Sequence, residues 1–245
     1  MTYGLIGHPL SHSFSANYFN EKFQREKRDD VYKLFDIPEI SLFQEIIVNM
    51  KDLNGLNVTI PYKEKILPYL HRLSPDALEI GAVNTIRLIR DSQSLILEGH
   101  NTDAPAFLYT ILPLLKDHMS RALILGTGGA SKAVAYALES IGITSIKVSR
   151  TKNENTLTYH EINEKTIRDN LIIVNTTPLG TYPDINGYPP IPYQFLTGSH
   201  LCYDLVYNPE KTLFLSKAEE RGAHIKNGIE MLHTQANLAW DIWQR

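Results

Sequence analysis

Residues 121–131 read Arg-Ala-Leu-Ile-Leu-Gly-Thr-Gly-Gly-Ala-Ser, and this stretch decides the fold. The apolar run is typical of a buried strand, and the glycines lead directly into a helical pattern over 130–141. Gly126 permits a tight turn, and Gly128 lets the backbone approach a pyrophosphate at the start of the helix. We therefore predict a dinucleotide-binding turn. Ser131 stands where the strict pattern has Gly or Ala, and a plain strand-to-helix turn is the alternative.

The end of the next expected strand indicates which dinucleotide would bind. NAD-binding units usually place Asp or Glu about 20 residues past the glycines, to hold the ribose hydroxyls. Here residues 147–152 read Lys-Val-Ser-Arg-Thr-Lys, and no carboxylate occurs before Glu154. Arg150 can pair bidentately with a 2′-phosphate, while the hydroxyls and the ammonium beside it add donors. This composition favours NADP(H) over NAD, with a solvated basic loop as the alternative.

Outward from the turn, strand and helix patterns alternate along the chain. Such alternation predicts an α/β fold in which parallel strands are joined by right-handed crossovers. The expected strands cover 3–7, 31–37, 56–60, 121–125, 145–149, 171–174 and 201–206, with a hairpin of 83–89 and 94–98. The expected helices cover 13–27, 40–50, 103–118 with an interruption at Pro113, 130–141, 213–221 and 228–244. We predict two domains: an α/β domain to about residue 102, and a Rossmann-like domain over 103–227 with the 103–118 helix as the link.

The composition excludes several classes of protein. The 245 residues carry 24 Lys plus Arg against 27 Asp plus Glu, and a net charge of −3 argues against nucleic acid as a partner. The longest apolar runs, such as 171–174, are far too short to span a membrane. Cys202 is the one cysteine and the N-terminus does not resemble a signal peptide, so we expect a cytoplasmic protein. We expect no metal, because His8 and His12 are separated by a proline and have no nearby carboxylate.

Polar side chains in the first domain follow expected strands or open expected helices. They include serines in 11–15, a hydroxyl and an ammonium in 57–63, Asn84, and the triplet 101–103. Taken singly, each residue is more often a helix cap or a turn former. Taken together, they supply hydroxyl, amide, ammonium and carboxylate groups from separate segments. A polyol ligand needs such a set of partners.

Eight short motifs resemble those of one known family. They are Gly7-His-Pro9 with His12-Ser-Phe-Ser15, Asn57-Val-Thr-Ile-Pro-Tyr-Lys63, Gly81-Ala-Val-Asn-Thr85, Asn101-Thr-Asp103, Gly126–Ser131, Asn175-Thr-Thr-Pro-Leu-Gly180, Tyr203-Asp-Leu-Val-Tyr-Asn-Pro209 with Thr212, and Asn227-Gly-Ile-Glu-Met-Leu232 with Gln235. Together they resemble the shikimate dehydrogenase family over nearly the whole chain. The chain departs from the family pattern at 104–106, where Ala-Pro-Ala follows the Asn-Thr-Asp triplet, and at Thr127 and Ser149.

The resemblance implies a two-domain α/β enzyme whose final helix returns to the first domain. The substrate domain would then comprise 1–102 plus about 228–245. The implied reaction is the reversible NADPH-dependent reduction of 3-dehydroshikimate to shikimate, in aromatic amino-acid biosynthesis. The implied partner is therefore a small molecule, and a monomer and a homodimer both remain open.

The resemblance also implies a role for individual residues, carried over position by position. Ser13 and Ser15 would hold the substrate carboxylate, with Tyr207 nearby. The groups around the ring hydroxyls would be Thr59, Lys63, Asn84, Asp103 and Gln235. The cofactor would be held by Gly126, Thr127, Gly128, Gly129, Ala130, Ser131, Ser149, Arg150 and Thr151. The nicotinamide side would be lined by Asn175, Thr176, Thr177, Pro178, Leu205 and Gly228.

Reduction of a ketone develops negative charge on oxygen and requires a proton. We assign Lys63 as the general acid/base, with Asp103 orienting the ammonium and the reacting hydroxyl. In the alternative, Lys63 only binds substrate and water delivers the proton. Two other functions remain open: a quinate/shikimate dehydrogenase that uses NAD, and a non-catalytic NADP(H)-binding sensor of the same fold.

Overall fold

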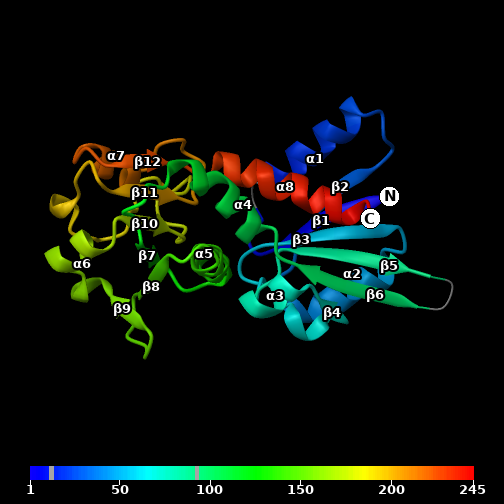
Figure 1. Ribbon diagram of the computed structural model, residues 1–245. Coiled ribbons are helices and arrows are strands. Elements are labelled where there is room, and N and C mark those ends of the chain that lie inside the picture. Colours follow the sequence, from blue (N-terminus) through cyan, green and yellow to red (C-terminus); the bar gives the residue numbers. More distant parts are fainter. Residues whose placement is uncertain (11–13, 92–93) are drawn as a thin grey trace. The chain divides into compact units, whose positions relative to one another are not determined.

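The computed structural model describes residues 1–10, 14–91 and 94–245, which form two compact units. Unit 1 comprises Met1–Thr102 together with Ala236–Arg245, and unit 2 comprises Asp103–Gln235. Each unit is a sheet with helices on both faces (Figure 1). The architecture is therefore α/β, as the alternation of strand and helix patterns predicts. The domain limits expected from the sequence remain a prediction.

The sheet of unit 1 is mixed, in the order β2-β1-β3-β5-β6-β4. Its strands are β1 (Thr2–Gly7), β2 (Val31–Asp36), β3 (Leu53–Val58), β4 (Arg72–Leu73), β5 (Thr85–Arg90) and β6 (Leu95–His100). Strand β1 is parallel to β2 and β3, whereas β5 is antiparallel to both β3 and β6. The β5–β6 pair is the hairpin that the sequence predicts.

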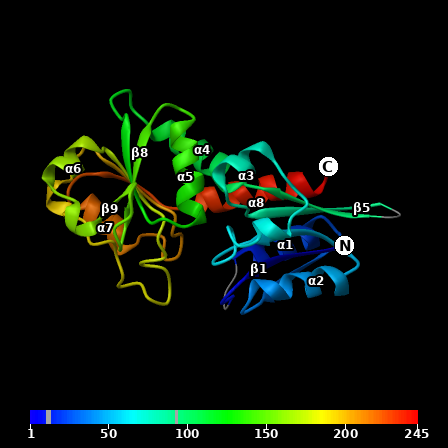
Figure 2. The ribbon, with the colours of Figure 1, turned by 90° about the horizontal axis from the view of Figure 1, so that it is seen from below.

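Helices cover both faces of this sheet, as Figure 2 shows. They are α1 (Phe14–Arg25), α2 (Phe43–Asn49) and α3 (Pro75–Ile80), together with the end of α8 (Ile229–Trp243) and the short 3₁₀ turns η1 (Ile40–Leu42) and η2 (Leu67–Tyr69). Phe19 and Phe23 of α1 pack with Ala239 and Trp243 of α8 on one face. Phe43 of α2 belongs to a separate core on the other face. Alternate strand residues therefore enter two different cores.

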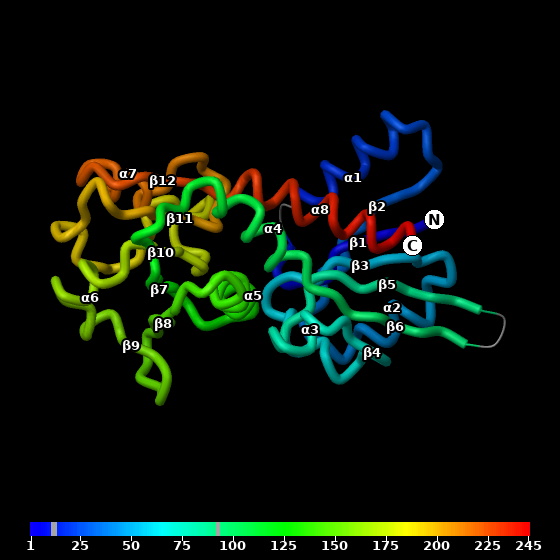
Figure 3. Tube along the Cα trace, viewed as in Figure 1, coloured from blue at the N-terminus to red at the C-terminus, as the bar shows by residue number. Residues whose placement is uncertain are grey.

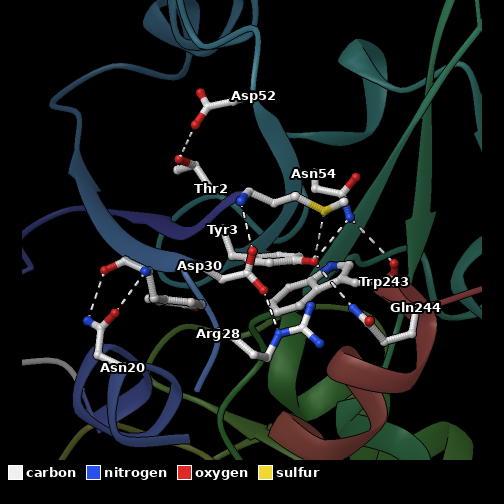
Figure 4. Close-up of polar contacts among 11 residues, drawn as sticks. Thr2, Tyr3, Asn20, Arg28, Asp30, Asp52, Asn54, Trp243 and Gln244 are labelled. Carbon is white, nitrogen blue, oxygen red and sulfur yellow. Dashed lines mark hydrogen bonds and ion pairs between the residues drawn. The ribbon is translucent and has the colours of Figure 1, made fainter. Parts of the chain in front are cut away.

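The last helix is anchored in unit 1 by Trp243, which is 3% exposed. Its Nε1 donates to the carbonyl oxygen of Ile86 at 3.0 Å, and a Cβ on Gly55 would lie 2.4 Å from its ring. Around it, Asn54 and Gln244 both donate to the hydroxyl of Tyr3, at 3.2 and 3.3 Å (Figure 4). The tube in Figure 3 follows this helix beside β1. The final helix thus returns to the first sheet.

The sheet of unit 2 is entirely parallel, in the order β12-β11-β10-β7-β8-β9. Its strands are β7 (Arg121–Leu125), β8 (Thr144–Ser149), β9 (Thr156–Thr158), β10 (Ile172–Asn175), β11 (Leu201–Asp204) and β12 (His224–Lys226). Its helices are α4 (Asp103–Ile111), α5 (Gly129–Glu139), α6 (Glu164–Asp169), α7 (Leu213–Glu219) and the start of α8, with 3₁₀ turns η3 (Leu112–Leu114), η4 (Tyr159–Glu161) and η5 (Tyr193–Phe195). Strands β7, β10 and β11 are buried on both faces because helices cover each side.

Among the expected elements that end earlier in the structure, two have a clear local cause. The helix expected over 103–118 ends at Ile111, because Pro113 lacks an N–H and disfavours a helical conformation at the residue before it. The strand expected over 201–206 ends at Asp204, because the Asp204 side chain accepts the N–H of Val206 at 3.0 Å in place of a neighbouring strand. Among the described residues, no helix is long and apolar enough to cross a membrane.

Candidate active site

Strand register places the candidate substrate residues of unit 1 at one edge of its sheet. Asn57 pairs with Thr85, and Thr85 pairs with His100. Because β5 is antiparallel to β3 and β6, its beginning lies where both of those strands end. Thr59, which follows β3, and Asn84, which precedes β5, are therefore brought to the same edge.

Lys63 is held at this edge by its backbone. The N–H of Val83, next to Asn84, donates to the carbonyl oxygen of Lys63 at 2.8 Å. The preceding Tyr62 is buried, and its hydroxyl donates to the carbonyl oxygen of Ile37 at 2.6 Å. The half-buried Lys63 side chain thus extends from a fixed turn. An ammonium in such a place can donate protons and stabilise a developing alkoxide.

Asn84 is 3% exposed and fixes the segment that leads to Asp103. Its Oδ1 accepts the N–H of Thr102 at 2.7 Å, and its Nδ2 donates to Oγ1 of Thr102 at 2.9 Å. The next residue, Asp103, opens α4 and is 6% exposed. A carboxylate in the first turn of a helix is favoured by the helix dipole.

Tyr32 is a residue of this edge that the sequence analysis missed. It is 3% exposed, and its hydroxyl donates to Oδ1 of Asn57 at 2.7 Å. Burial raises the pKa of Tyr32, so its hydroxyl stays protonated at neutral pH. Asn20 of α1 (Figure 4) bonds both the N–H and the carbonyl oxygen of Tyr32. Tyr32 reads as an ordinary strand residue in the sequence, and no spacing signals its role.

Two of the other expected substrate residues, Gln235 and Tyr207, belong to unit 2. Ser13 lies outside the described residues. Gln235 lies on α8, in the part of that helix that belongs to unit 2, and its Nε2 donates to the carbonyl oxygen of Leu232 at 2.9 Å. Tyr207 is half-buried and follows β11 in unit 2. The roles expected for these residues remain predictions.

In unit 2, the glycine turn lies where the strand order reverses direction. Strand β7 has β8 on one side and β10 on the other, and ligands of open α/β sheets bind at such a switch point. Gly126 has φ of 120°, and a Cβ there would lie 2.5 Å from Oγ1 of Thr176, which follows β10. Thr176 Oγ1 in turn donates to the carbonyl oxygen of Leu125 at 2.7 Å. Glycine is therefore needed to bring the two loops together.

The start of α5 has the properties of a pyrophosphate cradle. Gly128 is the N-cap residue, so no side chain caps the first N–H groups, and a Cβ there would meet nothing within 4 Å. Ser131 is 1% exposed, and its Oγ has no hydrogen-bond partner among the described residues. Uncapped N–H groups and a buried hydroxyl without an acceptor fit a dinucleotide phosphate.

The end of β8 offers a guanidinium for a 2′-phosphate. Arg150 is exposed, and among the described residues no carboxylate forms an ion pair with it. Lys152 instead pairs with Glu161 at 2.6 Å. The hydrogen bond from Lys152 lowers the pKa of Glu161 to about 2, so this carboxylate is ionised and already matched with a cation. The structure thus leaves Arg150 available for an anionic ligand.

Two further loops adjoin the glycine turn at the carboxyl edge of the unit 2 sheet. Asn175 ends β10, and its Oδ1 accepts both the N–H and the Oγ1 of Thr177, at 3.0 and 2.6 Å. Leu205 follows β11, and its N–H donates to the carbonyl oxygen of Asn175 at 2.9 Å. A Cβ on Gly228 would lie 2.2 Å from the carbonyl oxygen of Leu205. The residues expected on the nicotinamide side therefore form one connected group.

Among the described residues, no group of three or more His, Cys, Asp or Glu side chains could hold a metal ion. Cys202 is fully buried, and burial raises the pKa of its thiol, so it does not form a thiolate nucleophile at neutral pH.

Comparison with known proteins points to one family. Residues 5–86 match the family model described as the shikimate dehydrogenase substrate binding domain. The chain is 36% identical to a shikimate dehydrogenase (NADP(+)) of Caldanaerobacter subterraneus, over 98% of this chain and 90% of the relative. Its sequence is 30% identical to that of shikimate 5-dehydrogenase from Thermus thermophilus, whose crystal structure is a complex with NADP(H) and shikimate. The two structures match with a TM-score of 0.85 over 99% of this chain and 93% of that one. A quinate dehydrogenase from Corynebacterium glutamicum in complex with NAD is 27% identical, with a TM-score of 0.84 over 99% and 93% of the two chains.

Proposed function

Since this chain belongs to the shikimate dehydrogenase family, we propose that it catalyses the reversible NADPH-dependent reduction of 3-dehydroshikimate to shikimate. The observation that supports the proposal is the edge of unit 1, where strand pairing and backbone hydrogen bonds bring Thr59, Lys63 and Asn84 to the same part of the sheet. A cyclic ligand with several hydroxyls and a ketone needs donors and acceptors of these types. A sensor that performs no chemistry does not need the ammonium.

When bound, the reduced nicotinamide would supply a hydride that forms a new bond to the substrate carbonyl carbon. As that bond forms, the electron pair of the carbonyl double bond moves to oxygen. Lys63 donates a proton to this oxygen and so forms the hydroxyl of the product. Asp103 accepts hydrogen bonds from the ammonium and the reacting hydroxyl, and so orients both groups. In the reverse direction Lys63 accepts the proton.

The remaining polar residues bind and orient the ring. Ser13 and Ser15 hold the substrate carboxylate, with Tyr207 nearby. Thr59, Asn84 and Gln235 surround the ring hydroxyls.

The cofactor in this proposal is NADP(H). Gly126 to Ser131 hold the pyrophosphate against the start of α5, and Ser149, Arg150 and Thr151 hold the 2′-phosphate. The absence of an ion pair on Arg150 among the described residues supports this assignment. We place the enzyme in a reducing cytoplasm, in line with its one cysteine.

The experiment that tests the function is a set of NADPH-oxidation traces. We expect rapid oxidation with 3-dehydroshikimate, and much slower reduction of NAD⁺ with quinate measured in parallel. Faster turnover of quinate with NAD⁺ would establish the alternative that the Corynebacterium relative represents. Tight NADPH binding with no turnover of either substrate would establish a non-catalytic sensor.

A further inference from the structure

Asp204 is a buried carboxylate that the proposed mechanism does not use. It ends β11, is fully buried, and connects three segments of unit 2. Its Oδ1 accepts Nδ2 of Asn175 at 2.9 Å and the N–H of Val206 at 3.0 Å. Its Oδ2 accepts Oγ1 of Thr212 at 2.5 Å. Thr212 in turn caps α7 by accepting the N–H of Leu215.

The same hydrogen bonds continue into the loop after β10. Asn175 donates to Asp204 through its Nδ2, which turns its Oδ1 toward Thr177. The amide of Asn175 therefore has a fixed orientation because a carboxylate fixes one end of it. On the other side, Asp204 fixes the turn at Leu205 and Val206, against which Gly228 packs.

A buried carboxylate without a cation is costly for folding. Among the described residues, Asp204 has no ion pair, and its three partners are an amide, a backbone N–H and a hydroxyl. The titratable groups that interact with its charge are Cys202 of β11 and Tyr193 of η5. Burial raises the pKa of both, so they are neutral at pH 7 and do not offset the charge. A hydrophobic or amide side chain at this position would cost less folding free energy than a buried carboxylate. The carboxylate is therefore a candidate for a functional role.

We propose that Asp204 is a positioning residue: its carboxylate holds the Asn175–Thr177 loop and the Leu205–Val206 turn in the form that receives the nicotinamide. This inference rests on the proposed function, since it assigns those loops to the nicotinamide side. Asp204 itself need not touch the cofactor or the substrate.

The test is Asp204→Asn in the full chain, compared with His200→Asn. His200 precedes the same strand at its other end and is 1% exposed, so it is a matched buried polar residue at a distance from the carboxyl edge. For each variant the melting temperature, the Kd for NADPH, and kcat and KM for both substrates are measured at pH about 8. A displaced reactive group typically lowers the rate by 10- to 100-fold.

We expect Asp204→Asn to lower kcat by on the order of 10-fold or more, with KM for 3-dehydroshikimate unchanged and a melting temperature equal to or above that of the wild type. His200→Asn should show the opposite pattern, a lower melting temperature with normal kcat. Wild-type kinetics in Asp204→Asn overturn the inference. So does a loss of activity that accompanies a fall in melting temperature, as in a purely structural residue.

Thr212→Val provides a second route if Asp204→Asn does not fold. It removes one hydrogen-bond donor to Asp204, and Thr212→Ser restores that donor and the helix cap. We expect kcat to fall in the first variant and to recover in the second, and equal kcat in both would contradict the inference. If the wild-type chain neither binds nor oxidises NADPH, the proposed function fails and the inference fails with it, whereas an active wild type with an equally active Asp204→Asn refutes the inference alone.

Discussion

At the scale of single residues, the candidate site consists of side chains whose positions are set by buried neighbours. Lys63 extends from a turn that is fixed by the buried Tyr62 and by a backbone bond from Val83. Asn57 likewise accepts a hydrogen bond from the buried hydroxyl of Tyr32. Such support keeps flexible polar groups in place, which is the condition for efficient proton transfer and orientation.

Lys63→Ala should lower kcat by on the order of 10²-fold or more, because it removes the proposed proton donor. Steady-state kinetics with 3-dehydroshikimate and NADPH measure the effect. Lys65→Ala is the matched control, since Lys65 is exposed two residues further along. A normal kcat with only a raised KM would show that Lys63 binds substrate without taking part in the chemistry.

Arg150→Ala should raise KM for NADPH by roughly 10- to 100-fold and change KM for NADH little. A charge-assisted hydrogen bond contributes about 1.5–3 kcal/mol, and only NADPH carries the 2′-phosphate. Arg168→Ala, which removes an exposed arginine of α6 in the same unit, is the control. Equal effects on the two cofactors would contradict the assignment of Arg150 to the 2′-phosphate.

At the scale of elements, α8 completes the sheet of unit 1 through its apolar stripe. Trp243 fills the space that Gly55 leaves above β3 and donates to the backbone of β5. Trp243→Ala should therefore lower the free energy of unfolding by about 3–5 kcal/mol, the usual cost of truncating a large buried aromatic side chain. Denaturant unfolding followed by circular dichroism measures this loss.

The matched control on α8 is Asp241→Ala, which changes an exposed residue of the same helix. We expect a change within about 0.5 kcal/mol. If the two variants unfolded at the same denaturant concentration, packing of α8 would not stabilise unit 1.

At the scale of the whole molecule, Asp204 links stability to pH. Burial raises the pKa of Asp204 from 3.8 to about 6, so the folded chain binds a proton more tightly than the unfolded chain. The stabilisation from this proton is fully present below pH about 4 and is lost as the pH rises to about 6. The loss attributable to this group is about 3 kcal/mol by linkage.

Calorimetric unfolding of the wild type and of Asp204→Asn across this pH range measures the effect. The stability of the wild type relative to the variant should fall between pH about 4 and about 6 and then become constant. A difference that did not vary with pH would show that Asp204 has an ordinary pKa in the folded chain.

The sequence determined much of the molecule by itself. Hydrophobic period and glycine placement gave the α/β architecture, the β5–β6 hairpin and the turn at 126–131, because these features depend on local geometry. The family was confirmed by the comparisons from the motifs that the sequence displays. The predicted end of the helix over 103–118 was wrong by several residues, because Pro113 ends the helix that begins at Asp103 already at Ile111.

Only the tertiary structure decided which buried polar side chains hydrogen-bond to the segments that form the candidate site. Tyr32 and Asp204 act through partners that lie far away in the sequence, at Asn57 and at Asn175. Periodicity distinguishes buried from exposed positions, but a buried tyrosine or aspartate looks the same whether it fills space or orients a loop. Only strand pairing brings the two ends of each hydrogen bond together, so the physical role of such residues is visible in the fold alone.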